Sequence, residues 1–153
     1  MATRLRKEEK VEVLGRLPLF ENCSKRDLGQ IASIMVEARK PAGSYLTREG
    51  QDGGLMFVLV EGEAEVLAGD DPAPGSAEGR RVIGRLHAGD VVGELSLIDG
   101  HARSASVRAV SDVTVLEIVS DDFRELVHRS PSFVMSLLKA LSLRVREMEM
   151  LTS

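Results

Sequence analysis

The sequence has few of the residues that mark several common classes of protein. It contains one cysteine, Cys23, so no internal disulfide can form and nothing indicates an oxidising compartment. Aromatic residues make up 3% of the 153 residues and tryptophan is missing, so few rings are available to stack the bases of a nucleic acid. The net charge of −4 also argues against a protein that binds a phosphate backbone. We therefore expect no direct contact with nucleic acid.

Long apolar runs are also missing near the start of the chain. The first ten residues are mostly charged and lead into no apolar stretch, so neither a signal peptide nor a membrane span is predicted there. Hydrophobic residues form 43% of the sequence, which is typical of a globular protein, and the length suits one domain with a single core. We expect a cytoplasmic protein that does not contact a membrane.

Residues 1–36 are predicted to form an N-terminal helical segment. A short charged helix is expected over residues 4–16, and Pro18 ends it because proline disfavours helix in the residue before it. Ser24 is predicted to cap a second helix, with Asp27 three residues later in the manner of a capping box. Apolar residues then recur at helical spacing: Leu28, Ile31, Ala32, Ile34 and Met35.

Residues 37–119 show a different pattern, in which glycines separate short apolar runs. The run 56–60 predicts a buried strand, and Gly62 predicts a tight hairpin into a second strand over residues 64–67. Residues 69–79 predict a polar loop. Many short strands joined by such turns favour a mainly β fold, an antiparallel β-barrel or jelly roll with N-terminal and C-terminal helices.

A later strand alternates between two kinds of residue. Ala105, Val107 and Ala109 are predicted to face the core, and Ser104, Ser106 and Arg108 are predicted to be exposed.

Residues 120–153 are predicted to form a C-terminal hinge and a helix for signalling or dimerisation. Ser130 followed by Pro131 indicates the start of the last helix. Apolar residues then recur at alternating spacings of four and three, which is a short heptad seam: Val134, Leu138, Leu141, Val145 and Met148. Two covers for this seam remain open, namely the chain's own barrel and a second copy of the chain in a homodimer.

The residues best suited to bind a ligand lie between Gly89 and Ala109. Gly93 lets a ligand approach the backbone closely, and a short helix after it would present its amides to an anion. Arg103 offers a planar fork of donors that fits two phosphate oxygens. Glu94, when ionised, only accepts hydrogen bonds, which suits sugar hydroxyls. On spacing alone, a helix cap and a surface ion pair remain the simpler interpretation.

A resemblance to a known family changes this balance. Gly93-Glu94-Leu95-Ser96-Leu97 followed by Arg103-Ser104-Ala105-Ser106-Val107 resembles the phosphate-binding cassette of the cyclic nucleotide-binding domain family. That family includes the bacterial catabolite activator proteins and the regulatory subunits of protein kinase A. The resemblance extends to residues 17–20, 41–46, 57–62 and 86–90, and so covers nearly the whole chain.

The resemblance implies a sensor that binds cAMP or cGMP, with cAMP favoured, and performs no chemistry on it. Glu94 would accept a hydrogen bond from the ribose 2′-hydroxyl, and Arg103 would pair with the cyclic phosphate. Ligand capture would reorganise the C-terminal helices, which carry the signal to an unknown effector protein. The implied ligand-binding residues are Gly93, Glu94, Leu95, Ser96, Arg103, Ser104 and Ala105.

The sequence also departs from the family pattern. Ala102 stands where the family often has proline, and Met148 and Glu149 stand where a Thr-Ser pair of the catabolite activators touches the adenine. The alternative function is therefore a cyclic-nucleotide-like fold that has lost its ligand and serves as a protein-interaction or dimerisation module.

Other chemical motifs are missing. The three histidines never form a His-x-His pair, whereas a metal site would need several convergent imidazoles. The sequence contains no Gly-x-Ser-x-Gly elbow and no Walker lysine. We predict no metal site and no enzymatic activity.

Overall fold

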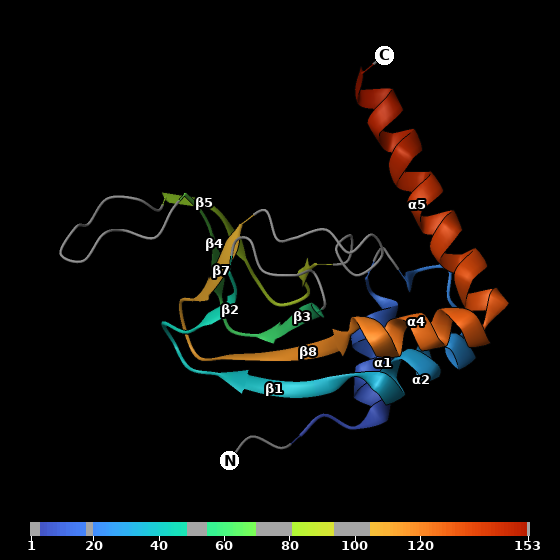
Figure 1. Ribbon diagram of the computed structural model, residues 1–153, viewed down its shortest axis with the longest axis horizontal. Coiled ribbons are helices and arrows are strands. Elements are labelled where there is room, and N and C mark those ends of the chain that lie inside the picture. Colours follow the sequence, from blue (N-terminus) through green and yellow to red (C-terminus); the bar gives the residue numbers. More distant parts are fainter. Residues whose placement is uncertain (1–3, 18–19, 49–54, 70–80, 94–104, 153) are drawn as a thin grey trace. The chain divides into compact units, whose positions relative to one another are not determined.

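The computed structural model describes residues 4–17, 20–48, 55–69, 81–93 and 105–152. The chain divides into two compact units, one formed by Val36–Ser120 and the other by Met1–Met35 together with Asp121–Ser153. The first unit contains the strands and the second contains the helices (Figure 1). The predicted order of helices, then strands, then helices is confirmed.

The strands form two four-stranded antiparallel sheets. One sheet has the order β1-β8-β3-β6 and the other has the order β2-β7-β4-β5. This double-sheet arrangement confirms the jelly-roll prediction, although the described strands form two sheets rather than one closed barrel. The bounds are β1 Val36–Lys40, β2 Tyr45–Thr47, β3 Leu55–Glu61, β4 Ala64–Ala68, β5 Arg81–Leu86, β6 Val91–Val92, β7 Ser106–Ala109 and β8 Val113–Val119.

The core of the strand-rich unit draws on both sheets. Phe57 and Leu59 of β3 belong to one sheet, while Val107 and Ala109 of β7 belong to the other, and each is 1–2% exposed. Burying such a side chain stabilises the fold by about 1.5–3 kcal/mol for the larger ones. Leu86 and Val92, which flank the turn before the candidate cassette, pack against the same cluster, together with Ala38, Leu46 and Val66.

The helical unit is organised around Phe133. Its helices are α1 (Lys7–Gly15), α2 (Lys25–Ile34), α4 (Ser120–Arg129) and α5 (Pro131–Thr152). The Phe133 ring lies 6.2 Å from the ring of Phe20 and 5.9 Å from that of Phe123, between centroids. Aromatic pairs at such distances add about 0.5–1.5 kcal/mol beyond the area they bury. The few aromatic residues are thus concentrated in the cores, where all four phenylalanines are buried.

Two predicted helix starts are confirmed. The Ser24 hydroxyl accepts a hydrogen bond from the Asp27 amide at 3.1 Å, and the Asp27 carboxylate accepts one from Ser132 Oγ at 3.2 Å. The Ser130 hydroxyl accepts from the Phe133 amide at 3.3 Å, at the start of α5. Each cap satisfies a backbone N–H that the helix itself leaves unpaired.

The seam of α5 is not the face that the helix buries. Phe133, Leu137 and Ala140 are 0–6% exposed and follow the spacing of an α-helix packed on its own unit. By contrast, seam residues Leu138, Val145 and Met148 are 53–66% exposed. These three seam positions therefore lie outside the face that α5 packs within its own unit.

Gly62 allows a direct test of the hairpin between β3 and β4. Its φ is +94°, and an added Cβ would clash with the carbonyl oxygen of Asp112. Gly43 has a similar φ of +87° with nothing within 4 Å of an added Cβ. We predict that Gly62→Ala lowers the free energy of unfolding by about 3 kcal/mol or more, and Gly43→Ala by about 1–2 kcal/mol, since only the first combines strain with a clash. Urea denaturation measures both, and equal losses would contradict the clash.

Candidate functional site

The predicted site residues lie at one place in the chain, and the structure describes both ends of it. Gly93 and Ala105 are described, whereas Glu94, Leu95, Ser96, Arg103 and Ser104 lie outside the described residues. The structure therefore shows how the chain enters and leaves residues 94–104, the middle part of the predicted cassette.

The entry to the cassette is a tight turn fixed to β3. The amide of Gly89 donates to the Leu59 carbonyl at 2.7 Å, and the Leu59 amide donates to the Asp90 carbonyl at 2.9 Å. Within the turn, the Asp90 amide donates to the His87 carbonyl at 3.0 Å, and the Asp90 carboxylate accepts from the His87 amide at 2.7 Å. Gly89 has a φ of +97°, which glycine adopts without steric cost. Backbone and side chain together hold this turn on a core strand.

The chain then forms β6 and reaches Gly93. Val91 and Val92 pair with Val58 and Phe57 of β3, at the edge of their sheet. Gly93 has a φ of +90°, a conformation that other residues rarely adopt. From the sequence, Gly93 is predicted to let a ligand approach the backbone closely. The structure adds a second reason for glycine at this position, namely its positive φ.

The chain leaves the cassette into the middle of the other sheet. Ala105 is half-buried and precedes β7, which lies between β2 and β4. Val107 and Ala109 are buried as predicted. The prediction that Ser106 is exposed is wrong, because Ser106 is 1% exposed. Its partner on β4, Leu67, is also buried, at 2% exposed. Since adjacent residues of a strand face opposite sides, this end of β7 is covered on both faces.

Sequence reasoning missed an ion pair beside this exit. Arg108 lies opposite Glu65 on β4, and its Nε donates to Glu65 Oε1 at 3.0 Å while Nη2 donates to the same oxygen. Hydrogen bonding to Glu65 raises the pKa of Arg108. The partners are 43 residues apart, so no local pattern indicates the pair. Because Glu65 occupies this guanidinium, Arg108 is a structural cation and leaves Arg103 as the predicted phosphate ligand.

Two kinds of reactive group, a metal cluster and an ionised thiol, are not found among the described residues. They contain no group of three or more histidine, cysteine or acidic residues that could hold a metal ion. Burial raises the pKa of the Cys23 thiol to about 11, so the thiol stays protonated at neutral pH and is a poor nucleophile. No helix of the described part of the chain is long and apolar enough to cross a membrane.

Comparison with known proteins agrees with this geometry. Residues 37–130, more than half of the chain, match the family described as "Cyclic nucleotide-binding domain". Among solved structures, the N-terminal domain of a transcriptional regulator from Streptomyces coelicolor is 26% identical with a TM-score of 0.79, over 89% of this chain and 94% of that one. The chain belongs to the cyclic nucleotide-binding domain family.

Two curated relatives show the range of this family. A cAMP-dependent protein kinase regulatory subunit of Emericella nidulans is 32% identical over 114 residues, which are 74% of this chain and 26% of that protein. A cGMP-dependent protein kinase of Caenorhabditis elegans is 32% identical over 110 residues, which are 72% of this chain and 13% of that protein. The chain thus spans about a quarter or less of the length of these two relatives.

The Asp90 side chain tests the entry turn. We predict that Asp90→Ala lowers the free energy of unfolding by about 1 kcal/mol, because the His87 amide loses its acceptor. Asp90→Asn retains an acceptor oxygen at the same place and is expected to cost much less. Urea denaturation of the three proteins measures the difference, and equal losses for alanine and asparagine would show that this hydrogen bond does not stabilise the turn.

Proposed function

We propose that the protein is a sensor of cAMP, which it binds with Glu94 and Arg103 and whose presence it relays through α4 and α5. The observation that carries the proposal is the family match over residues 37–130, combined with a carboxylate and an arginine at the two cassette positions that need them. A cyclic nucleotide presents a ribose hydroxyl beside a phosphate. An ionised carboxylate accepts from the first, and a guanidinium fork donates to the second.

The anchored ends of the cassette support this assignment. Gly93 follows a strand of one sheet and Ala105 precedes a strand of the other, and the hydrogen bonds of Leu59 hold the entry turn. Strands of the two sheets therefore set where this segment of the chain begins and ends. In the proposed site, amides near Leu95, Ser104 and Ala105 add donors for the phosphate, and the Ser104 hydroxyl reaches the phosphate or the base.

The preference for cAMP is the finer part of the proposal. Overall identity does not distinguish the two nucleotides, since the relatives named as cAMP-dependent and cGMP-dependent are both 32% identical. The preference rests on the likeness of the sequence to bacterial catabolite activators.

The proposed relay uses the direct connection of strand to helix. β8 ends at Val119 and α4 begins at Ser120, so no loop separates the strand from the first C-terminal helix. α5 follows after Ser130, and Phe133 joins α4 and α5 through its contact with Phe123. A ligand that binds one arrangement of these helices better than another shifts the population toward it.

Removal of the proposed phosphate ligand tests the site. We predict that Arg103→Ala weakens cAMP binding about 10- to 150-fold, because a hydrogen bond to a charged group contributes about 1.5–3 kcal/mol. Arg103→Lys should lose nearly as much, since an ammonium group cannot bridge two oxygens. Calorimetric titration of the folded proteins measures the affinities.

Arg85 supplies the matched control for that titration. Its side chain is 55% exposed and lies 3.9 Å from Glu63, outside the cassette, so Arg85→Ala should keep the wild-type affinity. Unchanged affinity in folded Arg103→Ala would refute the site. A wild-type protein that binds neither nucleotide would favour the ligand-free interaction module instead, and cGMP displacing cAMP at lower concentration would reverse the ligand preference.

The exposed seam leads to a proposal about assembly, in which α5 pairs with its copy in a homodimer. Leu138 and Val145 would alternate with Val134, Leu141 and Met148 along the contact, in the 4-3 spacing of a coiled coil. A stripe of this kind gains stability only when another apolar surface covers it.

Leu141→Asp tests this pairing. An unpaired charge in the seam should convert the dimer to a monomer, while Leu143→Asp, which changes an exposed leucine outside the seam, should leave the dimer intact. Light scattering after size exclusion, with and without cAMP, gives the mass of each protein. A wild-type chain that is monomeric in both states would remove the dimer from the proposal.

A further inference from the structure

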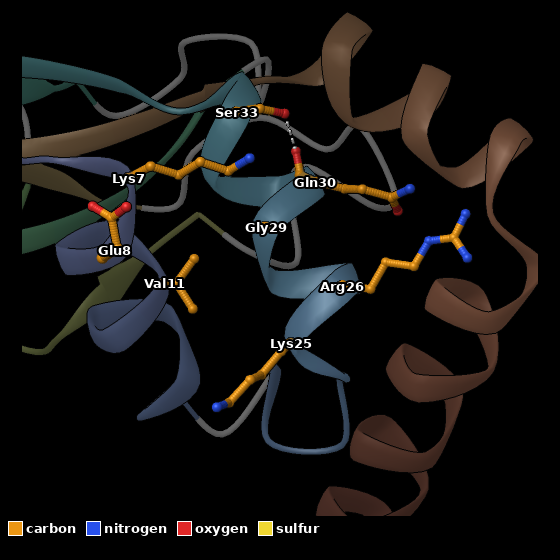
Figure 2. Close-up of a pocket in the computed structure, with 8 residues that line it drawn as sticks. All are labelled: Lys7, Glu8, Val11, Lys25, Arg26, Gly29, Gln30 and Ser33. Atoms are coloured by element: carbon orange, nitrogen blue, oxygen red, sulfur yellow. Dashed lines mark hydrogen bonds between the residues drawn. The ribbon is translucent and has the colours of Figure 1, made fainter.

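A shallow groove lies on the helical unit, away from the residues discussed so far. It is lined by residues of α1 and α2 and has a volume of about 670 Å³. Gly29 forms its floor, and Figure 2 shows Lys7, Val11 and Lys25 on one side of Gly29 and Arg26 and Gln30 on the other. Glu8 and Ser33 complete the lining.

Among the described residues, no salt bridge neutralises the three basic side chains that line this groove. Among the described residues of α1 and its flanks, Arg6 pairs with Glu9 and Arg16 pairs with Glu12. Lys7, Lys25 and Arg26 have no acidic partner within 4.0 Å in the part of the chain that the structure describes. Lys25 and Arg26 also occupy the first turn of α2, where the helix dipole disfavours cations. The protein thus keeps three positive charges at a place where they do not stabilise its own helix.

Gly29, at the floor of the groove, also lowers the stability of α2. Glycine in the middle of a helix is less favourable than alanine by about 1 kcal/mol. An added Cβ at Gly29 would meet only the Lys7 side chain, at 3.8 Å to Cε and 4.0 Å to Nζ, which is ordinary contact. Packing does not require glycine here, whereas a backbone or side chain that approaches α2 closely would require it.

We propose that this groove binds an acidic segment of a partner protein, which lies over Gly29 with carboxylates directed to Lys7 and Lys25 on one side and to Arg26 on the other. The proposal concerns a second site and does not depend on cAMP binding. The cations lie on both sides of the floor, so they fit an extended ligand better than a single phosphate. Three basic residues beside Glu8 are also fewer than the four to eight, roughly, that attract proteins to anionic membranes.

The side chain of Gln30 indicates that the ligand is an acidic polypeptide rather than a lipid phosphate. Its Oε1 is buried and has no hydrogen-bond partner in the described structure. Because this oxygen accepts no hydrogen bond in its present position, it breaks none when the side chain turns into the groove and accepts from a peptide N–H. The phosphodiester group of a lipid offers acceptors only, so it would leave this oxygen unsatisfied.

The test uses the full chain and a fluorescein-labelled, non-helical peptide that contains several glutamates, beside the same peptide with glutamines. We expect the glutamate peptide to bind more tightly, and added salt to weaken it, because exposed charges are screened. Each of Lys7→Gln, Lys25→Gln and Arg26→Gln should weaken binding about 2- to 5-fold, and the triple variant by about 10-fold or more. Arg6→Gln and Arg16→Gln remove exposed arginines that are already paired, and should change nothing.

Gly29→Leu separates binding from folding. Leucine has a higher helix propensity than glycine, so the thermal midpoint should stay the same or rise while peptide binding is lost. Unchanged binding in Gly29→Leu or in the triple variant would overturn the proposal, as would equal binding of the glutamine peptide. Tighter binding of pyrophosphate or of phosphatidylserine vesicles than of the glutamate peptide would also overturn it, in favour of a phosphate or a membrane.

Discussion

The candidate site depends on how Leu59 holds the turn before it. This buried residue of β3 accepts from Gly89 and donates to the Asp90 carbonyl, so a loop position is tied to the core strand by two backbone hydrogen bonds. Val91 and Val92 then continue the pairing along β3. The place where the cassette begins is therefore set by the sheet rather than by the cassette itself. A site built in this way can vary its ligand contacts without changing where they are presented.

The last helix divides into two parts with different roles. Its first turns are fixed by the Ser130 cap, by the rings around Phe133, and by the hydrogen bond from Ser132 to Asp27. Beyond Ala140 the described apolar side chains are largely exposed. Backbone hydrogen bonds keep a helix rigid along its axis, which rises about 1.5 Å per residue. A rotation of the anchored end of a helix therefore moves its far end as well.

Local patterns in the sequence predict the structure correctly, whereas features that depend on distant residues escape prediction from the sequence. The caps at Ser24 and Ser130 follow from a hydroxyl and an amide three residues apart, so the sequence alone predicts them. The burial of Ser106 depends on Leu67 of a neighbouring strand, and the partner of Arg108 lies 43 residues away. In α5 the helix buries Leu137 rather than the seam residue Leu138, because both stripes occur in the sequence and tertiary packing chooses between them. The cassette residues themselves were predicted from resemblance, which no local pattern replaces.

Tyr45 gives the molecule a built-in optical probe. It is the only tyrosine in a chain without tryptophan, so it alone dominates the intrinsic fluorescence. It lies in register with Arg108 on β7, the strand that leaves the cassette, and the guanidinium carbon of Arg48 lies 4.0 Å from its ring centre. Contact with a cation and a shift in its strand partner both alter the emission of a phenol ring. The protein therefore reports the state of its strand-rich unit without any label, and its helices contribute almost no background to that signal.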